Sequence, residues 1–188
     1  MPLHDLPALA ILLIFAAAGL SILIVQARTG VPPMSSSAAE GREVAALLRQ
    51  ANLPDDAVIY DLGAGWGSLV IALAHAFPNA QIRGVELSPL PYWISRLRTR
   101  GLPNLSLSQG DFFNTDLSDA QAVTCYLMIK AMPKLADLLD RTLTPGTSVV
   151  LLSFWFRERQ AAATSMGAGL LGATALYYWP AKSAATHG

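Results

Sequence analysis

The sequence has little that could support disulfide, metal or nucleic-acid chemistry. It contains one cysteine, Cys125, so no intramolecular disulfide can form. Cys125 stands in an apolar stretch, and we expect its side chain to be a small buried apolar group rather than a nucleophile. His4, His75 and His187 are scattered and form no ligand cluster, so no metal site is predicted. Thirteen basic and thirteen acidic residues cancel, and no run of Lys and Arg is interleaved with aromatic residues. DNA and RNA are therefore not expected partners.

Apolar residues are abundant, at 53% of the chain with a mean hydropathy of +0.40. Residues 6–25 carry no charge and are numerous enough to cross a bilayer core as a helix. A cleaved signal peptide is the alternative, but its basic start is missing, since His4 and Asp5 stand there instead. The first flanking cations, Arg28 and Arg42, follow the apolar run, which favours a cytoplasmic C-terminal side. We expect an uncleaved single-pass anchor in contact with the lipid bilayer.

The rest of the chain is predicted to form one domain. Residues 1–30 are assigned to the anchor and residues 31–188 to the domain, with a short proline-containing link at 29–35. Ser37 and Glu40 have the spacing of a capping box in front of an amphipathic helix.

Strands and helices are expected to alternate after a first strand that ends at Asp61. The pattern predicts helices over 68–77, 89–100 and 133–142, and strands over 81–87, 105–109, 122–127, 147–153 and 173–179. Ser88 and Pro89 are predicted to cap the second of these helices, and Gly101 to end it. Such alternation is typical of an α/β protein with a mostly parallel sheet and helices on both faces, which binds ligands beyond the carboxyl ends of its strands.

A glycine-rich loop follows the first strand. Residues 60–67 read Tyr-Asp-Leu-Gly-Ala-Gly-Trp-Gly and precede an apolar helical stretch. Glycines let the backbone approach a ligand, and the following helix offers free N–H groups, so the loop predicts a site for a nucleotide-like cofactor. A tight turn without a ligand is the alternative. A dinucleotide fingerprint would need its third glycine at Ser68, so NAD is a poor match.

Several of these features together resemble the class I S-adenosylmethionine-dependent methyltransferases. They are Asp61, the Gly-x-Gly-x-Gly loop, and Glu86 at the end of the next strand. The resemblance implies a Rossmann-like fold, S-adenosyl-L-methionine as cofactor, the loop beneath its methionine and ribose, and Glu86 on both ribose hydroxyls. It also implies that Asp111 binds the adenine amino group and Phe112 packs on the ring; the alternative is that this pair is a turn and a core side chain. The cofactor-binding residues predicted in this way are Tyr60, Asp61, Gly63, Ala64, Gly65, Gly67, Glu86, Leu87, Asp111 and Phe112.

A closer resemblance covers most of the chain from Val31 onward. With its anchor, its link and the motifs Gly-Val-Glu-Leu-Ser-Pro and Gly-Asp-Phe-Phe, the sequence is similar to membrane-anchored protein-lysine methyltransferases of the ATP synthase c-subunit and adenine nucleotide translocase type, and to their bacterial relatives. That implies a bacterial inner-membrane protein with a cytoplasmic catalytic domain and a membrane-protein substrate. Trp66 and Ser68 depart from the acidic and basic residues usual there, and the segment after the fifth strand departs as well. The C-terminal part is expected to be abbreviated, because the residues after that strand look too few for two strands and a helix.

Three functions follow as hypotheses. The first is an anchored protein-lysine N-methyltransferase, in which aromatic faces at Tyr126 or Trp66 hold the cationic groups, unless both merely pack in the core. The second is a methyltransferase of a lipid or quinone-like molecule, which an anchor would suit equally. The third is a non-catalytic binding or assembly protein with a degenerate cofactor site. Methylation of a nucleobase amine is disfavoured, because the Asn/Asp-Pro-Pro-Tyr/Phe segment of such enzymes does not follow the fourth strand.

Overall fold

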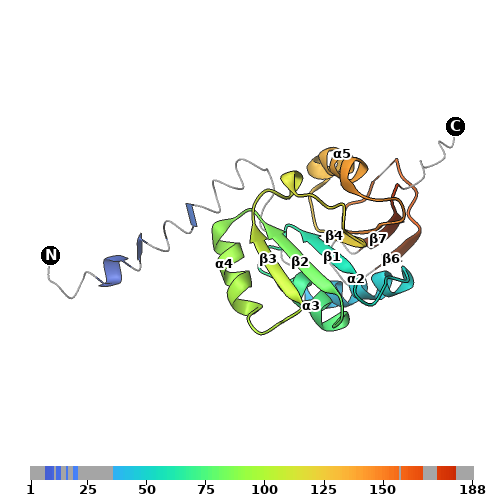
Figure 1. Ribbon diagram of the computed structural model, residues 1–188. Coiled ribbons are helices and arrows are strands. Elements are labelled where there is room, and N and C mark those ends of the chain that lie inside the picture. The colour runs from blue at the N-terminus through green and yellow to red at the C-terminus, as the bar shows by residue number, and fades with distance from the viewer. Residues whose placement is uncertain are drawn as a thin grey trace.

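The domain is built on one twisted sheet whose first five strands run parallel (Figure 1). The computed structural model describes residues 36–156, 158–166 and 173–180, and residues 7–10, 12–13, 16 and 19–20 nearer the N-terminus. Within these residues the strand order is β3-β2-β1-β4-β5-β7-β6. The strands are β1 (Val58–Leu62), β2 (Gln81–Glu86), β3 (Leu105–Gln109), β4 (Ala122–Cys125), β5 (Ser148–Leu152), β6 (Ala163–Met166) and β7 (Ala173–Tyr178). Strand β7 pairs antiparallel with both β5 and β6.

Helices cover both faces of the sheet, as predicted. Helices α2 (Ala38–Gln50) and α3 (Ser68–Ala76) lie on one face, α5 (Met132–Thr142) lies on the other, and α4 (Pro89–Arg98) connects β2 to β3 (Figure 1). Two short 3-10 turns, Phe112–Asn114 and Ile129–Ala131, complete the described helical residues of the domain. Each face has its own apolar cluster, one centred on α5 and the other on α2 and α3.

The local signals place the helix ends correctly, although one predicted cap lacks its side-chain hydrogen bond. Ser37 and Glu40 form the predicted capping box, with the Glu40 N–H donating to Ser37 Oγ and the Ser37 N–H to Glu40 Oε2. Gly101 follows α4 with a φ of +89°, as expected of a residue that ends a helix. Ser88 is the N-cap residue of α4 and Pro89 is its first residue, as predicted, but the Ser88 side chain makes no capping hydrogen bond. The Ser88 backbone N–H donates to Glu86 Oε1, so this residue also fixes a carboxylate.

Helix α2 runs beside α3 in the same direction. Gly41 of α2 faces Ala72 of α3 so closely that a Cβ at position 41 would lie 2.7 Å from the Ala72 Cβ. Ser36, just before α2, and Ser68, at the start of α3, both line one pocket. The start of α2 is therefore carried to the carboxyl edge of the sheet, where ligands of parallel sheets bind.

The C-terminal part differs from the prediction. The range 161–172 was not expected to contain a strand, yet β6 forms there and pairs with β7 over residues 163–166. Its residues Ala-Thr-Ser-Met are small or flexible and alternate between half-buried and exposed, as suits an edge strand with little apolar signal. The expectation that two strands and a helix would not all fit agrees with the described residues, which hold both strands and no helix after β5. The two strands fit because the described residues between β5 and β6, 153–156 and 158–162, form a loop instead of a helix.

Most of the predicted anchor, and all of the 29–35 link, lie outside the described residues. Those described between residues 7 and 20 are helical, and Leu9, Leu12, Leu13 and Leu20 among them are exposed. Among the described residues, no helix has both the length and the apolar character needed to cross a membrane.

Candidate active site

The glycine-rich loop joins β1 to α3 and takes a backbone shape that only glycine adopts readily. Gly63, Gly65 and Gly67 have φ values of +84°, +54° and +85°. The N–H groups of Gly63 and Ala64 donate to the Val85 carbonyl at 2.9 and 3.0 Å, which ties the loop to the neighbouring strand β2. A Cβ on Gly63 would meet only Leu127, at 3.9 Å, and would otherwise project into open space. The loop therefore leaves room for a ligand to lie directly on the backbone.

Helix α4 supports the same loop from the other side. A Cβ on Gly67 would lie 2.9 Å from the Ser95 Cβ, so the loop and the helix touch through their smallest residues. Arg98 of α4 also donates a hydrogen bond to the Trp66 carbonyl. The position of α4 and the shape of the loop thus depend on one another.

Glu86, at the end of β2, is buried and uses both carboxylate oxygens. Oε2 accepts from the Gly65 N–H at 2.8 Å, and Oε1 accepts from the Ser88 N–H at 2.7 Å. Its side chain therefore locks the centre of the loop in place. Each oxygen keeps a second lone pair, so the carboxylate can still accept two hydrogen bonds from a vicinal diol.

Asp61 is the second buried carboxyl of the site, with only 2% of its surface exposed. Burial raises its pKa to about 7; the hydrogen bond from Thr124 Oγ1, at 3.0 Å, opposes this shift, and the nearby charge of Glu86 adds to it. A positively charged ligand group at this position would relieve the cost of the buried charge. Cys125 lies close by and is fully buried, which raises the pKa of its thiol and fits the predicted role of a small core residue.

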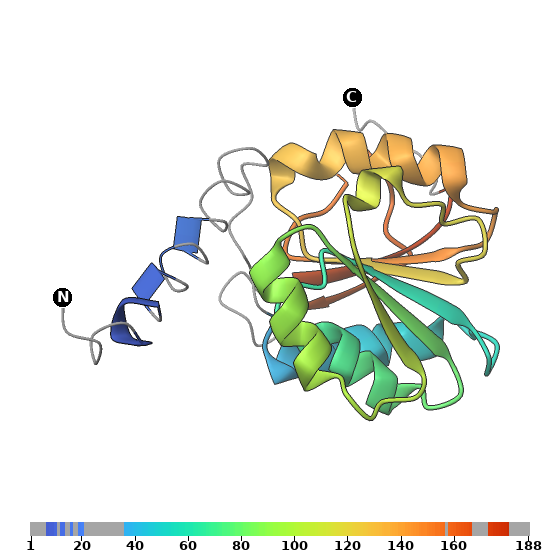
Figure 2. The same ribbon diagram turned by 60° about the vertical axis from the view of Figure 1, so that its left-hand side comes forward.

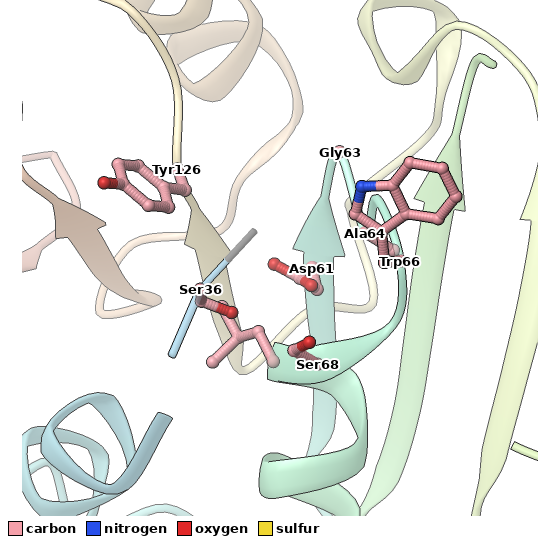
Figure 3. A pocket seen from close by; sticks show the side chains of 8 residues that line it. Ser36, Asp61, Gly63, Ala64, Trp66, Ser68 and Tyr126 are labelled. Atoms are coloured by element: carbon pink, nitrogen blue, oxygen red, sulfur yellow. The ribbon is translucent and has the colours of Figure 1, made fainter. Parts of the chain in front are cut away.

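A pocket that is open to solvent lies above the loop. It is lined by Ser36, Asp61, Gly63, Ala64, Trp66, Ser68, Leu69 and Tyr126. Figure 3 shows Tyr126 and Trp66 on either side of Asp61, with Ser36 and Ser68 close to one another below. Trp66 and Tyr126 are both half-buried, and Tyr126 also packs against the apolar cluster of α2 and α3. Sequence reasoning did not predict Ser36, Ser68 and Leu69 as lining residues, and only the packing of α2 along α3 reveals the first.

Not every predicted cofactor residue reaches this pocket. Tyr60 turns to the α5 side of the sheet, where Arg83 Nη1 donates to its hydroxyl at 2.8 Å and the hydroxyl itself donates to Asp119. Leu87 follows Glu86 and is more than a third exposed. The roles of these two residues toward a cofactor stay predictions.

Asp111 and Phe112 lie one strand further out, past the end of β3. Asp111 Oδ1 accepts from the Phe113 N–H at 3.0 Å and so caps a short turn, while Phe112 packs on Phe113 with ring centroids 4.4 Å apart. The structure thus shows the turn and packing roles of this pair. The Gly110 N–H donates to the Glu86 carbonyl, which keeps the turn beside the loop, and the adenine contact stays a prediction.

The known proteins to which this chain is similar include several methyltransferases. A curated protein-lysine N-methyltransferase from Saccharolobus islandicus is 32% identical over 114 residues, which cover 59% of this chain and 71% of the relative. The crystal structure of an RNA methyltransferase from Salinibacter ruber in complex with S-adenosyl-L-homocysteine aligns with a TM-score of 0.64 and 29% identity, covering 76% of this chain and 91% of that one. CalS10, an amino pentose methyltransferase from Micromonospora echinaspora with bound S-adenosylmethionine, aligns with a TM-score of 0.52 and 28% identity, covering 80% and 61%.

The strand order, the loop and these relatives define an S-adenosylmethionine-dependent methyltransferase with a Rossmann-like α/β fold. Within that class, the model of the ANTKMT methyltransferase domain matches residues 61–163, and the chain belongs to this family. The residues present fit the cofactor. The open loop backbone would lie against it, Glu86 offers free lone pairs to a diol, and Asp61 offers a carboxyl to a cationic group.

Proposed function

We propose that this protein is a protein-lysine N-methyltransferase that acts on a membrane-embedded or membrane-adjacent protein. The single observation that carries the lysine assignment is the pair of half-buried aromatic residues, Trp66 and Tyr126, on either side of the pocket (Figure 3). A lysine side chain has an apolar stem and a cationic end, and two aromatic faces suit both parts. The lysine methyltransferase from Saccharolobus islandicus supports the same choice.

The chemistry asks the chain to bind and align rather than to supply a nucleophile. S-adenosyl-L-methionine supplies an activated methyl group when bound. The lysine nitrogen first loses its proton to solvent, and its lone pair then forms the new nitrogen–carbon bond as the carbon–sulfur bond breaks. A partly desolvated aromatic pocket favours the neutral amine and holds it in line with the methyl group. Trp66 and Tyr126 would do this work, while Glu86 and the loop hold the cofactor.

The membrane part of the proposal rests on residues 6–25 and on where the domain begins. The uncharged run is long enough to span a bilayer, and ten residues separate it from Ser36. Ten extended residues reach about 35 Å at most. Because Ser36 lines the pocket, a spanning segment would keep the methylation site near the bilayer surface.

The experiment is methyl transfer from tritiated S-adenosylmethionine by the full chain to isolated membranes, followed by separation into protein, solvent-extractable and RNA fractions. Label in the protein fraction, recovered after hydrolysis as methyl-lysine, would support the proposal. Label in solvent-extractable material would favour the lipid or quinone-like substrate instead. A folded protein that binds no cofactor would favour the assembly role.

Two variants test the aromatic pair. Trp66→Ala and Tyr126→Ala should each lower kcat/KM for the protein acceptor by about 2- to 30-fold, the range of one cation–π contact, with little change in affinity for S-adenosylhomocysteine. Tyr178→Ala, at an exposed aromatic residue at the end of β7, is the matched control. Core packing alone would instead lower the Tm of both variants and leave kcat/KM of the folded fraction unchanged.

A further inference from the structure

The outer face of α4 combines exposed apolar side chains with arginines. Trp93 and Leu97 each expose 58% of their surface and lie one helical turn apart. At 100° per residue, Pro89 and Arg96 fall on the same stripe of the helix, and Arg100 follows in the turn directly after it; all three are exposed. We define these five residues as the α4 outer face.

The opposite side of the helix is already used, so the α4 outer face is a separate surface. Tyr92 and Ser95 are buried against the domain, and Ser95 packs on Gly67 of the cofactor loop. Trp93 meets the ring of Tyr92 edge-on, with ring centroids 5.4 Å apart, and the Arg96 guanidinium lies 5.4 Å from the centre of its indole ring, but most of the side chain stays exposed. An exposed tryptophan paired with an arginine places apolar area and positive charge at the same point.

The segment of the chain that contains the α4 outer face carries only positive charges. Residues 87–110 contain three arginines, Arg96, Arg98 and Arg100, and no aspartate or glutamate. A cationic stripe interleaved with Trp and Leu complements an anionic phospholipid surface, where the indole can lie at the headgroup level and the guanidinium groups at the phosphates.

The position of α4 in the fold agrees with such a surface. The helix starts directly after β2, at the same carboxyl edge of the sheet to which Ser36 is carried. In Figures 1 and 2 the described helical residues between 7 and 20 extend from the domain on the side where α4 lies. The reach of the ten residues before Ser36 would bring this edge close to the bilayer.

We propose that the α4 outer face docks on an anionic lipid surface and so orients the methylation site toward the membrane. This inference rests on the membrane placement in the proposed function, but it is independent of which atom accepts the methyl group. Arginines near an anionic surface each contribute about fivefold to binding, so Arg96 and Arg100 together should shift the ratio of docked to undocked domain by about 25-fold. Arg98 is left out because it holds the loop.

The test uses the full chain in nanodiscs made with brominated phospholipids, with or without 30% of an anionic lipid, and reads tryptophan fluorescence. Bromine quenches an indole that reaches the headgroup and acyl region. The difference between the wild type and Trp93→Phe isolates the signal of Trp93 from the other tryptophans. We expect quenching of Trp93 in anionic discs, and a much weaker effect in neutral discs or in Arg96→Gln/Arg100→Gln.

The matched control, Arg49→Gln/Arg141→Gln, removes two exposed arginines from α2 and α5 and should leave the quenching of Trp93 unchanged. Equal quenching in the wild type and Trp93→Phe, with protein and discs eluting together, would overturn the docking proposal alone. Protein that elutes apart from the discs would overturn the membrane placement and docking with it. Methyl transfer to lysine is measured separately, so its failure is distinguishable from both results.

Discussion

Replacing Glu86 by alanine should damage the cofactor site in two measurable ways. The carboxylate accepts hydrogen bonds from the Gly65 and Ser88 N–H groups, and it is expected to accept two more from the ribose. Losing two charge-assisted bonds to the cofactor weakens binding by roughly 2 to 4 kcal/mol, or about 30- to 900-fold in Kd. Two buried N–H groups also lose their acceptor, which lowers the free energy of unfolding by about 1 to 3 kcal/mol for each.

Calorimetric titration with S-adenosylhomocysteine in detergent measures the first effect, and urea unfolding measures the second. Glu86→Gln keeps one acceptor oxygen and should fall between the wild type and Glu86→Ala in both assays. Asp137→Ala, at an exposed carboxylate on α5, is the control and should change neither. A folded Glu86→Ala that binds S-adenosylhomocysteine as tightly as the wild type would refute the assignment of this residue to the cofactor.

Three further predictions follow from the same region. The pKa of Asp61 is raised from 3.8 to about 7 in the folded state, so the unfolded state releases its proton first as the pH rises. The free energy of unfolding should therefore fall by up to about 4 kcal/mol between pH 4 and 7 and level off above pH 7. Urea unfolding of Asp61→Asn should lack this part of the pH dependence. Gly84→Ala would place a Cβ 2.5 Å from Leu107 Cδ2 and 3.0 Å from the Ala64 Cβ, and should cost about 1 to 3 kcal/mol in unfolding free energy; an unchanged midpoint would contradict this packing. Gly67→Ala would place a Cβ against Ser95 at a position where φ is +85°, so the loop or α4 would have to shift. This variant should bind S-adenosylhomocysteine more weakly in calorimetry, whereas wild-type affinity would show that the loop tolerates a displaced α4.

Sequence reasoning predicted the parts of the fold that depend on strong local signals. The glycine-rich loop, the capping box at Ser37 and the alternation of strands and helices are all encoded within a few residues, and the structure confirms them. Strand β6 escaped because an edge strand of small polar residues has almost no apolar pattern. The contact of Ser88 with Glu86 was not predicted, because the same residue type that caps helices can also offer its backbone to a neighbouring carboxylate.

The candidate site was predictable along the strands but not between distant segments. Asp61 and Glu86 stand at the ends of adjacent parallel strands, so the topology alone brings them together. Ser36 reaches the pocket through the contact of Gly41 with Ala72, which joins residues thirty positions apart and leaves no mark in either local sequence. Tyr60 shows the converse, because the period of a strand turns it to the opposite face from its neighbour Asp61.

The parallel course of α2 and α3 has a practical consequence for anyone who modifies this protein. Because the chain enters the domain at the rim of the pocket, a tag, reporter or fusion partner attached just before Ser36 would stand at the entrance used by the acceptor. The loop at Asp55 and Asp56, between α2 and β1, lies at the amino edge of the sheet instead. An insertion there would leave the entrance clear, so labelled forms of the enzyme are better built at that loop than at the N-terminal end of the domain.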